Sequence, residues 1–223
     1  MKKWIILSML ASLILSSCSF TLNYEEGSGT VIQENRQIAT VEKVVFEGLG
    51  KLVITQGSET LLEIEAEDNI LPRIKTEVDR GTLTISFDTD RWENIIRPTK
   101  PIIFHLQVEN LEELSLSGLG DVELIDLKLD ALAVRLSGAG TVDASGSAAQ
   151  VDINVSGAGS FDSGDLESEI VNINLSGAGN ATVWATETLD VSISGLGNVS
   201  YYGSPRLHQS ITGLGNIQAL GER

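Results

Sequence analysis

The chain has 223 residues, of which 31 are acidic and 15 are basic, so its formal net charge at pH 7 is −16. This charge excludes a nucleic-acid-binding surface, because phosphate backbones repel an acidic protein. The chain has one cysteine, Cys18, which excludes an intramolecular disulfide and leaves stability to the packed core.

Residues 1–17 are predicted to be a lipoprotein signal peptide. Two lysines precede an apolar run that is shorter than the roughly 20 residues needed to span a bilayer. The run ends in a Leu-Ser-Ser-Cys sequence that resembles the bacterial lipobox, which implies that Cys18 starts the mature protein and carries the lipid that anchors it to a membrane. Ser19 resembles the pattern that permits sorting to the outer membrane. The alternative is an ordinary secretory signal with an incidental cysteine.

The mature chain divides into three predicted parts. Residues 18–40 are polar and rich in Glu, Gly and Ser, so we expect a flexible tether. Residues 41–110 contain short segments in which apolar and polar residues alternate, the pattern of half-buried strands. They form either irregular coils or a small sheet that caps the next part, and the second is favoured. Residues 46–52 resemble an early copy of the repeat that dominates residues 111–223.

That repeat is a Ser/Thr-Gly-Leu/Ala-Gly tetrapeptide, which occurs six times with its first glycines 18 to 20 residues apart. A fixed period of this size indicates stacked coils. We expect the glycines to be structural and to permit positive φ in the turns. They are Gly118, Gly120, Gly138, Gly140, Gly157, Gly159, Gly177, Gly179, Gly195, Gly197, Gly213 and Gly215.

Aligned copies produce columns of like residues. The columns two and four residues before the first glycine and four after it are almost entirely apolar, so they are predicted to point inward. The columns three and five residues before it are mostly polar, as in Asn154 and Asn174, and are predicted to face water. Small polar residues three positions after it, such as Asn180 and Asn198, are expected to form hydrogen-bonded ladders.

The repeated Ser-Gly-x-Gly turns behind a strand region and a lipobox are similar to the bacterial "putative autotransporter adhesin, head GIN domain" family. The resemblance covers residues 41–223. It implies an all-β fold, a right-handed parallel β-helix, and a role at the cell surface. It brings no catalytic residues with it.

Few residues offer catalytic chemistry. The two histidines, His105 and His208, lie in no recognisable motif and are predicted to be surface residues. The chain lacks the His/Cys spacing of a zinc site, so neither a metal nor another cofactor is expected. Asp143 and Asp162 lie one coil apart in a predicted outward column, where either adventitious calcium or plain solvation would account for them.

Trp184 and Tyr202 lie one coil apart, and strand alternation predicts that both point outward about 4.8 Å from each other. With Asn154 and Asn174 they form a candidate contact face for a glycan or an envelope or surface protein. The alternative is that the rings pack over the rim of the coil.

The sequence favours a non-enzymatic, lipid-anchored envelope protein whose rigid solenoid is a binding, adhesion or structural module. A second hypothesis is that the protein is a carbohydrate-active β-helix enzyme that acts on an acidic polysaccharide. A third is a scaffold that stacks end to end through a weakly shielded last coil. The oligomeric state is not predicted.

Overall fold

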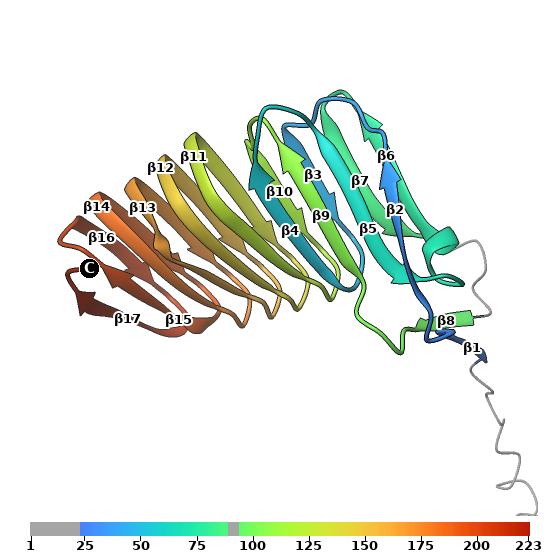
Figure 1. Cartoon of the computed structure of the whole chain (residues 1–223). Helices are drawn as coiled ribbons and strands as arrows, with labels where there is room; N and C mark the ends of the chain where they lie inside the picture. Colours follow the sequence, from blue (N-terminus) through green and yellow to red (C-terminus); the bar gives the residue numbers. More distant parts are fainter. Residues whose placement is uncertain (1–22, 89–93) are drawn as a thin grey trace, which may run out of the picture.

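The computed structural model describes residues 23–88 and 94–223. The predicted signal peptide, Cys18 and Ser19 therefore lie outside the described residues. Within them the fold is all-β, with seventeen strands and one short 3-10 helix. Figure 1 shows the strands stacked side by side along a single axis that ends at the C-terminus. Over these residues, no helix has the length and apolar character to cross a bilayer.

The elements fall into an irregular N-terminal set and a regular C-terminal set. The first comprises β1 (Asn23–Glu26), β2 (Val31–Arg36), β3 (Lys43–Phe46), β4 (Lys51–Gln56), β5 (Leu61–Glu67), η1 (Leu71–Arg73), β6 (Ile74–Asp79), β7 (Thr82–Phe87), β8 (Asn94–Arg97) and β9 (Ile103–Val108). The second comprises β10 (Glu113–Leu116), β11 (Asp121–Leu136), β12 (Thr141–Val155), β13 (Ser160–Leu175), β14 (Asn180–Ile193), β15 (Leu196–Tyr202), β16 (Arg206–Ile211) and β17 (Leu214–Gly221).

Each regular coil has two arms joined by a glycine turn. We call the strand segment before the turn arm 1 and the segment after it arm 2. Each long strand, β11 to β14, runs along arm 2, bends, and returns along arm 1 of the next coil. Neighbouring coils pair in parallel and in register, so that Leu116, Leu136, Val155, Leu175 and Ile193 lie over one another. The predicted β-solenoid is confirmed.

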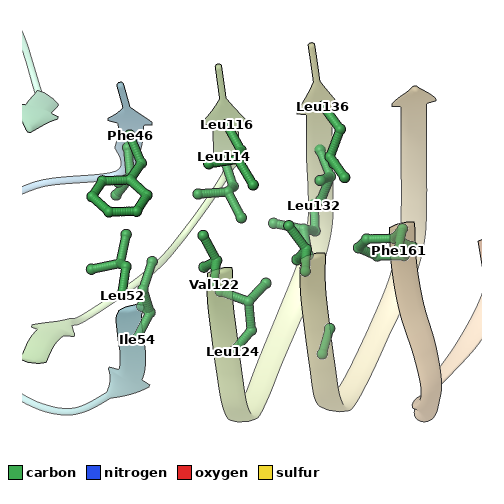
Figure 2. Packing of buried hydrophobic residues seen from close by; sticks show 14 of the residues in the cluster. Phe46, Leu52, Ile54, Leu114, Leu116, Val122, Leu124, Leu132, Leu136 and Phe161 are labelled. Carbon is green, nitrogen blue, oxygen red and sulfur yellow. The ribbon is translucent and has the colours of Figure 1, made fainter. Parts of the chain in front are cut away.

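The core lies between the two arms and consists of the predicted inward columns. Leu114 and Leu116 from arm 1 and Val122 and Leu124 from arm 2 extend into the same interior (Figure 2), and all four are at most 1% exposed. The apolar alternation therefore builds one continuous row of buried side chains along the axis. Burial of each Leu or Val contributes roughly 1.5–3 kcal/mol, so the stack needs no cross-links.

The repeated glycines are required for a different reason from the one the sequence suggests. None of the twelve turn glycines, all within the described part of the chain, has a positive φ. Instead, the turns stack so closely that a Cβ on Gly138 would overlap the carbonyl oxygen of Gly118, and one on Gly157 would overlap that of Gly138. The turn backbones are hydrogen-bonded from coil to coil, as from the Ala139 amide to the Gly118 carbonyl at 3.2 Å. Close approach of backbones, not left-handed conformation, selects glycine here.

The predicted polar ladders beside these turns form only in places. Asn198 donates from its backbone amide and its side-chain amide to Asn180 Oδ1 at 3.1 and 3.2 Å. The Thr141 amide donates to Asp121 Oδ1 at 3.0 Å. These side chains lie on the surface or are half-buried, so water competes for them and the ladder is not continuous among the described residues.

The early copy at residues 46–52 is confirmed. β3 pairs with β10 and β4 with β11, so Phe46 lies over Leu116 and Leu52 over Val122 although 70 residues separate them in sequence. The intervening chain adds a further layer, in which β7 pairs with β3 and β9 with β4, both in parallel. Antiparallel strands then cover this layer: β6 on β7, and β5 on β9. Residues 41–110 thus combine an irregular coil with the favoured capping sheet.

The tether predicted for residues 18–40 is wrong from residue 23 onward. β2 pairs antiparallel with β5, and β1 pairs in parallel with β8. Arg36 at the end of β2 donates from Nη1 to the Ile74 carbonyl at 2.8 Å and to Thr76 Oγ1 at 3.0 Å, which joins β2 to β6. The polar composition of this segment comes from its position as an outer strand, where most side chains face water.

At the opposite end the last coil is exposed, as the sequence suggests. β16 and β17 each pair with a strand on one side only. Ile211 is 41% exposed, although its equivalents in the earlier coils are buried. Among the described residues no antiparallel strand covers this end.

Candidate functional site

A polar groove runs across the outer face of arm 1, over β12, β13, β14 and β16. It has a volume of about 480 Å³. Its floor is made by the strands that bury Ile153, Ile173 and Val191 toward the core, while alternation sends their neighbours outward. The outward residues form two columns along the axis. They are Asp152, Asn172, Asp190 and His208 in one column, and Asn154, Asn174, Ser192 and Ser210 in the other.

The first column is internally hydrogen-bonded. Asn172 Nδ2 donates to Asp152 Oδ1 at 2.7 Å, and Gln150 Nε2 donates to Asp152 Oδ2 at 2.8 Å. One coil further, His208 Nδ1 lies 2.7 Å from Asp190 Oδ1. These bonds orient the two carboxylates, the Asn172 amide and the His208 ring on one side of the groove. The column is therefore a preorganised set of polar groups.

The second column is open. Asn154, Asn174, Ser192 and Ser210 are all exposed, and none of their side chains hydrogen-bonds to another described residue. Each amide offers two donors and an acceptor, and each hydroxyl offers one donor and an acceptor. In-register pairing spaces them at about 4.8 Å, so they span roughly 14 Å. The structure thus places the predicted Asn154 and Asn174 together in one groove.

An ion pair limits the groove toward the N-terminal end. Arg135 occupies the position equivalent to Asn154 in the preceding coil and pairs with Glu113 across the strands. Its guanidinium therefore ends the run of small polar side chains. The open column starts at Asn154 for this reason.

The structure separates the aromatic pair from the asparagines. Trp184 and Tyr202 are register partners on β14 and β15, as predicted, but both are only half exposed and neither lines the groove. The Arg223 guanidinium lies 5.0 Å from the centre of the Tyr202 ring, and Arg223 also pairs with Asp165. The single contact face made of all four residues is therefore wrong, because the rings lie on arm 2 and the asparagines on arm 1.

The outer face of arm 2 is acidic. Glu123, Asp143 and Asp162 are stacked in register, and with Asp165 they line a pocket of about 330 Å³. Burial, followed by the negative charges of Asp162 and Glu123, raises the pKa of the Asp143 carboxyl above its ordinary value. Lys51 Nζ lies 2.5 Å from Glu123 Oε2 and neutralises that carboxylate.

Both histidines lie at the surface, as predicted, but their neighbours were not predicted. His208 joins the groove through Asp190, and His105 lies beside Glu65, with Nε2 3.6 Å from Glu65 Oε1. The signal that could have placed His208 was its column, which contains Asp152 and Asp190 in earlier coils. His105 had no such signal, because its neighbours come from an antiparallel strand.

Solved structures of bacterial proteins resemble this chain. A solved structure named as a putative adhesin from Bacteroides fragilis is 26% identical, with a TM-score of 0.74, and covers 88% of this chain and 100% of its own. A structure named as a putative lipid binding protein from Parabacteroides distasonis is 22% identical, with a TM-score of 0.59, covering 89% and 100%. A putative adhesin from Parabacteroides merdae is 18% identical, with a TM-score of 0.57, covering 89% and 99%. The last two show the fold alone.

No protein of curated function matches the chain. The sequence profile described as "Putative auto-transporter adhesin, head GIN domain" matches residues 41–205, which include β3 to β15 and most of the polar groove. The chain belongs to the head GIN domain family.

Proposed function

We propose that the protein is a non-enzymatic binding module of the cell envelope and that the polar groove on arm 1 is its ligand site. The observation that supports this is the open column of Asn154, Asn174, Ser192 and Ser210, a row of unpaired donors and acceptors on a rigid sheet. The sheet fixes the backbone positions of this row, and the neighbouring column is already oriented by its own hydrogen bonds, so only the side chains of the open column pay an ordering cost on binding. The family name and the adhesin relative agree with a surface-binding role.

The ligand class follows from the chemistry of the groove. Unpaired amides and hydroxyls at regular spacing match the hydroxyl groups of a glycan, which both donate and accept. Asp152 and Asp190 add negative charge to the same groove, and the chain as a whole carries −16. We therefore expect a neutral glycan to bind better than an acidic one, since like charges repel.

Glycan-array binding tests this proposal. Asn154→Ala with Asn174→Ala removes two amides from the open column. Binding to neutral glycans should fall by about thirtyfold, because two lost hydrogen bonds of about 1 kcal/mol each amount to about 2 kcal/mol. The matched control is Thr182→Ala with Ser200→Ala, a stacked polar pair on arm 2. Equal binding by the groove variant and the control would contradict the proposal.

The same array separates the groove from the aromatic pair. Trp184→Ala with Tyr202→Ala leaves the groove intact, so binding should be retained if the variant is folded. If the aromatic variant loses binding and the asparagine variant keeps it, the contact site lies on arm 2 and the groove is not the site.

We also propose that Cys18 carries a lipid that anchors the module. The lipobox-like sequence before Cys18 supports this proposal, and the arrangement would leave the solenoid free to extend from the membrane. Replacing Cys18 by Ser should abolish incorporation of labelled fatty acid and move the protein from the membrane fraction to the soluble fraction. Unchanged labelling of the Ser variant would contradict the proposal.

An enzyme is the second candidate, supported by the acidic pocket of arm 2. A carboxyl of raised pKa beside ionised carboxylates is the pairing used by glycoside hydrolases. An acidic polysaccharide would meet Glu123, Asp143 and Asp162 at this face, however, and the positive charges beside them, Lys51 and Arg223, are already paired with Glu123 and Asp165. Turnover of an acidic polysaccharide with and without calcium, lost in Asp143→Asn, would establish the enzyme and displace the binding module.

A further inference from the structure

Three side chains of complementary chemistry converge on the outer face of the N-terminal cap. Glu63 and Glu65 alternate outward from β5, and His105 projects from β9 directly opposite Glu63. One carboxylate oxygen from each glutamate and one imidazole nitrogen all lie within 4.8 Å of one another. The antiparallel pairing fixes this arrangement, because side chains of paired residues lie about 4.5–5.5 Å apart at Cβ.

These groups make few contacts with the rest of the fold. Glu63 makes no hydrogen bond or ion pair within residues 23–88 and 94–223. The contact of His105 in that part of the chain is with Glu65, which also accepts from Gln33 Nε2 at 3.0 Å. No lysine or arginine in these ranges pairs with either glutamate. Two carboxylates and an imidazole therefore face one another at the surface, and no basic side chain of the described residues neutralises either carboxylate.

We propose that Glu63, Glu65 and His105 bind a divalent transition-metal ion of the zinc type. Zn²⁺ takes imidazole nitrogen and carboxylate oxygen at about 2.1 Å, and a fourth position would be filled by water. The imidazole favours zinc-type ions over Ca²⁺ and Mg²⁺, which prefer oxygen ligands only. Glu63 and Glu65 are half-buried and His105 is exposed, so their side chains can change rotamer and the donor atoms, now within 4.8 Å of one another, can reach the separations that the metal requires.

The ion would connect two antiparallel strands of the cap. β5 and β9 cover one end of the hydrophobic core, where Phe46 and Phe104 pack edge to face with ring centres 5.4 Å apart. An ion that binds the folded cap and not the unfolded chain raises the stability of the fold. This site is on the cap and is independent of the groove on arm 1, so either proposal can fail without the other.

The test is a zinc titration of untagged full-length protein by calorimetry, with Cys18→Ser in every variant so that its thiol cannot bind the ion. We expect one Zn²⁺ per chain, with affinity reduced at least about tenfold by His105→Ala, since even lesser perturbations of metal sites cost this much. Glu63→Gln should also weaken binding. The matched control is His208→Ala, which removes the histidine of the groove and should leave the affinity unchanged.

A second measurement makes the result independent of heats of binding. Zinc should raise the melting temperature of the parent protein and of His208→Ala, but not that of His105→Ala. The proposal is overturned if the parent protein does not bind zinc, if His208→Ala loses binding while His105→Ala keeps it, or if Ca²⁺ binds as tightly as Zn²⁺.

Discussion

The regular coils and the N-terminal cap use different means to hold a solenoid together. In the coils from β10 onward, one rule is repeated: apolar columns stack inward and glycine backbones approach closely at each turn. In the cap, individual polar side chains make unique contacts. Glu67, Arg36 and Arg73 each join segments that are 15 or more residues apart in sequence. The coils therefore tolerate change at any one polar surface position, whereas the cap depends on particular residues.

Glu67 shows how the cap differs. Its carboxylate is fully buried and accepts hydrogen bonds from the Gly29 amide at 2.6 Å, from the Thr99 amide at 2.9 Å and from the Thr99 hydroxyl at 2.5 Å. Burial alone would raise the pKa of this carboxyl, but the hydrogen bonds from Thr99, Gly29 and Lys100 outweigh burial and lower it. No group of this kind occurs among the buried residues of the regular coils, where the buried polar side chains are Ser163 and Ser168.

The largest expected loss of stability comes from replacing a turn glycine of the regular coils. In Gly138→Ala the new methyl group would overlap the Gly118 carbonyl, so both turns must separate. We expect a loss of about 3 kcal/mol in the free energy of unfolding, the upper part of the range for overpacking. The control is Gly164→Ala, whose methyl group would meet side chains only, the end of Arg223 at 3.0 Å and the edge of the Tyr202 ring at 3.2 Å, so no backbone has to move. Urea titrations that show equal stabilities for the two variants would contradict the close-approach explanation.

The next largest loss of stability is expected from replacing Glu67, the buried carboxylate of the cap. Glu67→Gln removes the charge that the Thr99, Gly29 and Lys100 donors stabilise, so the melting temperature at pH 7 should fall. Because the folded-state pKa lies below the ordinary value, this stabilisation is present above that ordinary value and is lost as pH falls through the folded-state pKa. The difference between wild type and variant should therefore shrink in acid. Glu59→Gln, at an exposed turn, is the control.

Hydrogen exchange localises the Glu67 effect. Exchange at residues 27–30 and at Thr99 and Lys100 should become faster in Glu67→Gln, while exchange in β12 and β13 should not change. Uniform acceleration along the chain would show that the cap and the coils unfold as one unit, which would contradict their being stabilised separately.

The smallest effect concerns the acidic column of arm 2. The pKa of Asp143 is raised, so its charged form is disfavoured in the folded state, and stability should fall as pH rises through the range between its ordinary and raised pKa values. Asp143→Asn should therefore be more stable than wild type at pH 7, by about 0.5 kcal/mol or less, the scale of an exposed cross-strand pair. The gain should vanish in acid. Glu187→Gln, an exposed control, should show no gain.

The sequence predicts the coils far better than the cap. A column of like residues repeats the same physical information in each coil, so Leu116 and Leu136 can be assigned to the core without coordinates. The cap contains each contact once, so nothing in the sequence pairs Glu67 with Thr99 or Glu63 with His105. The prediction of a flexible tether was wrong for the same reason, because β2 can be recognised as a strand only through its partner β5.

The candidate site was predicted in part. Asn154 and Asn174 follow from the outward column, and their shared groove follows from register. Whether a side chain lies on arm 1 or arm 2 depends on where the coil bends. The spacing of the tetrapeptides does not locate that bend. Trp184 and Tyr202 were therefore assigned to the wrong face, although their pairing with each other was correct.

In-register stacking of the coils is the claim on which the groove and the glycine rule both depend. Spin labels at Leu119→Cys and Leu214→Cys, with Cys18→Ser, report it directly, because both tips are more than 70% exposed and five coil spacings separate them. At about 4.8 Å for each spacing, pulsed electron paramagnetic resonance should give a narrow distribution centred near 24 Å. A broad distribution, or a centre displaced by two or more strand spacings, would contradict the stack.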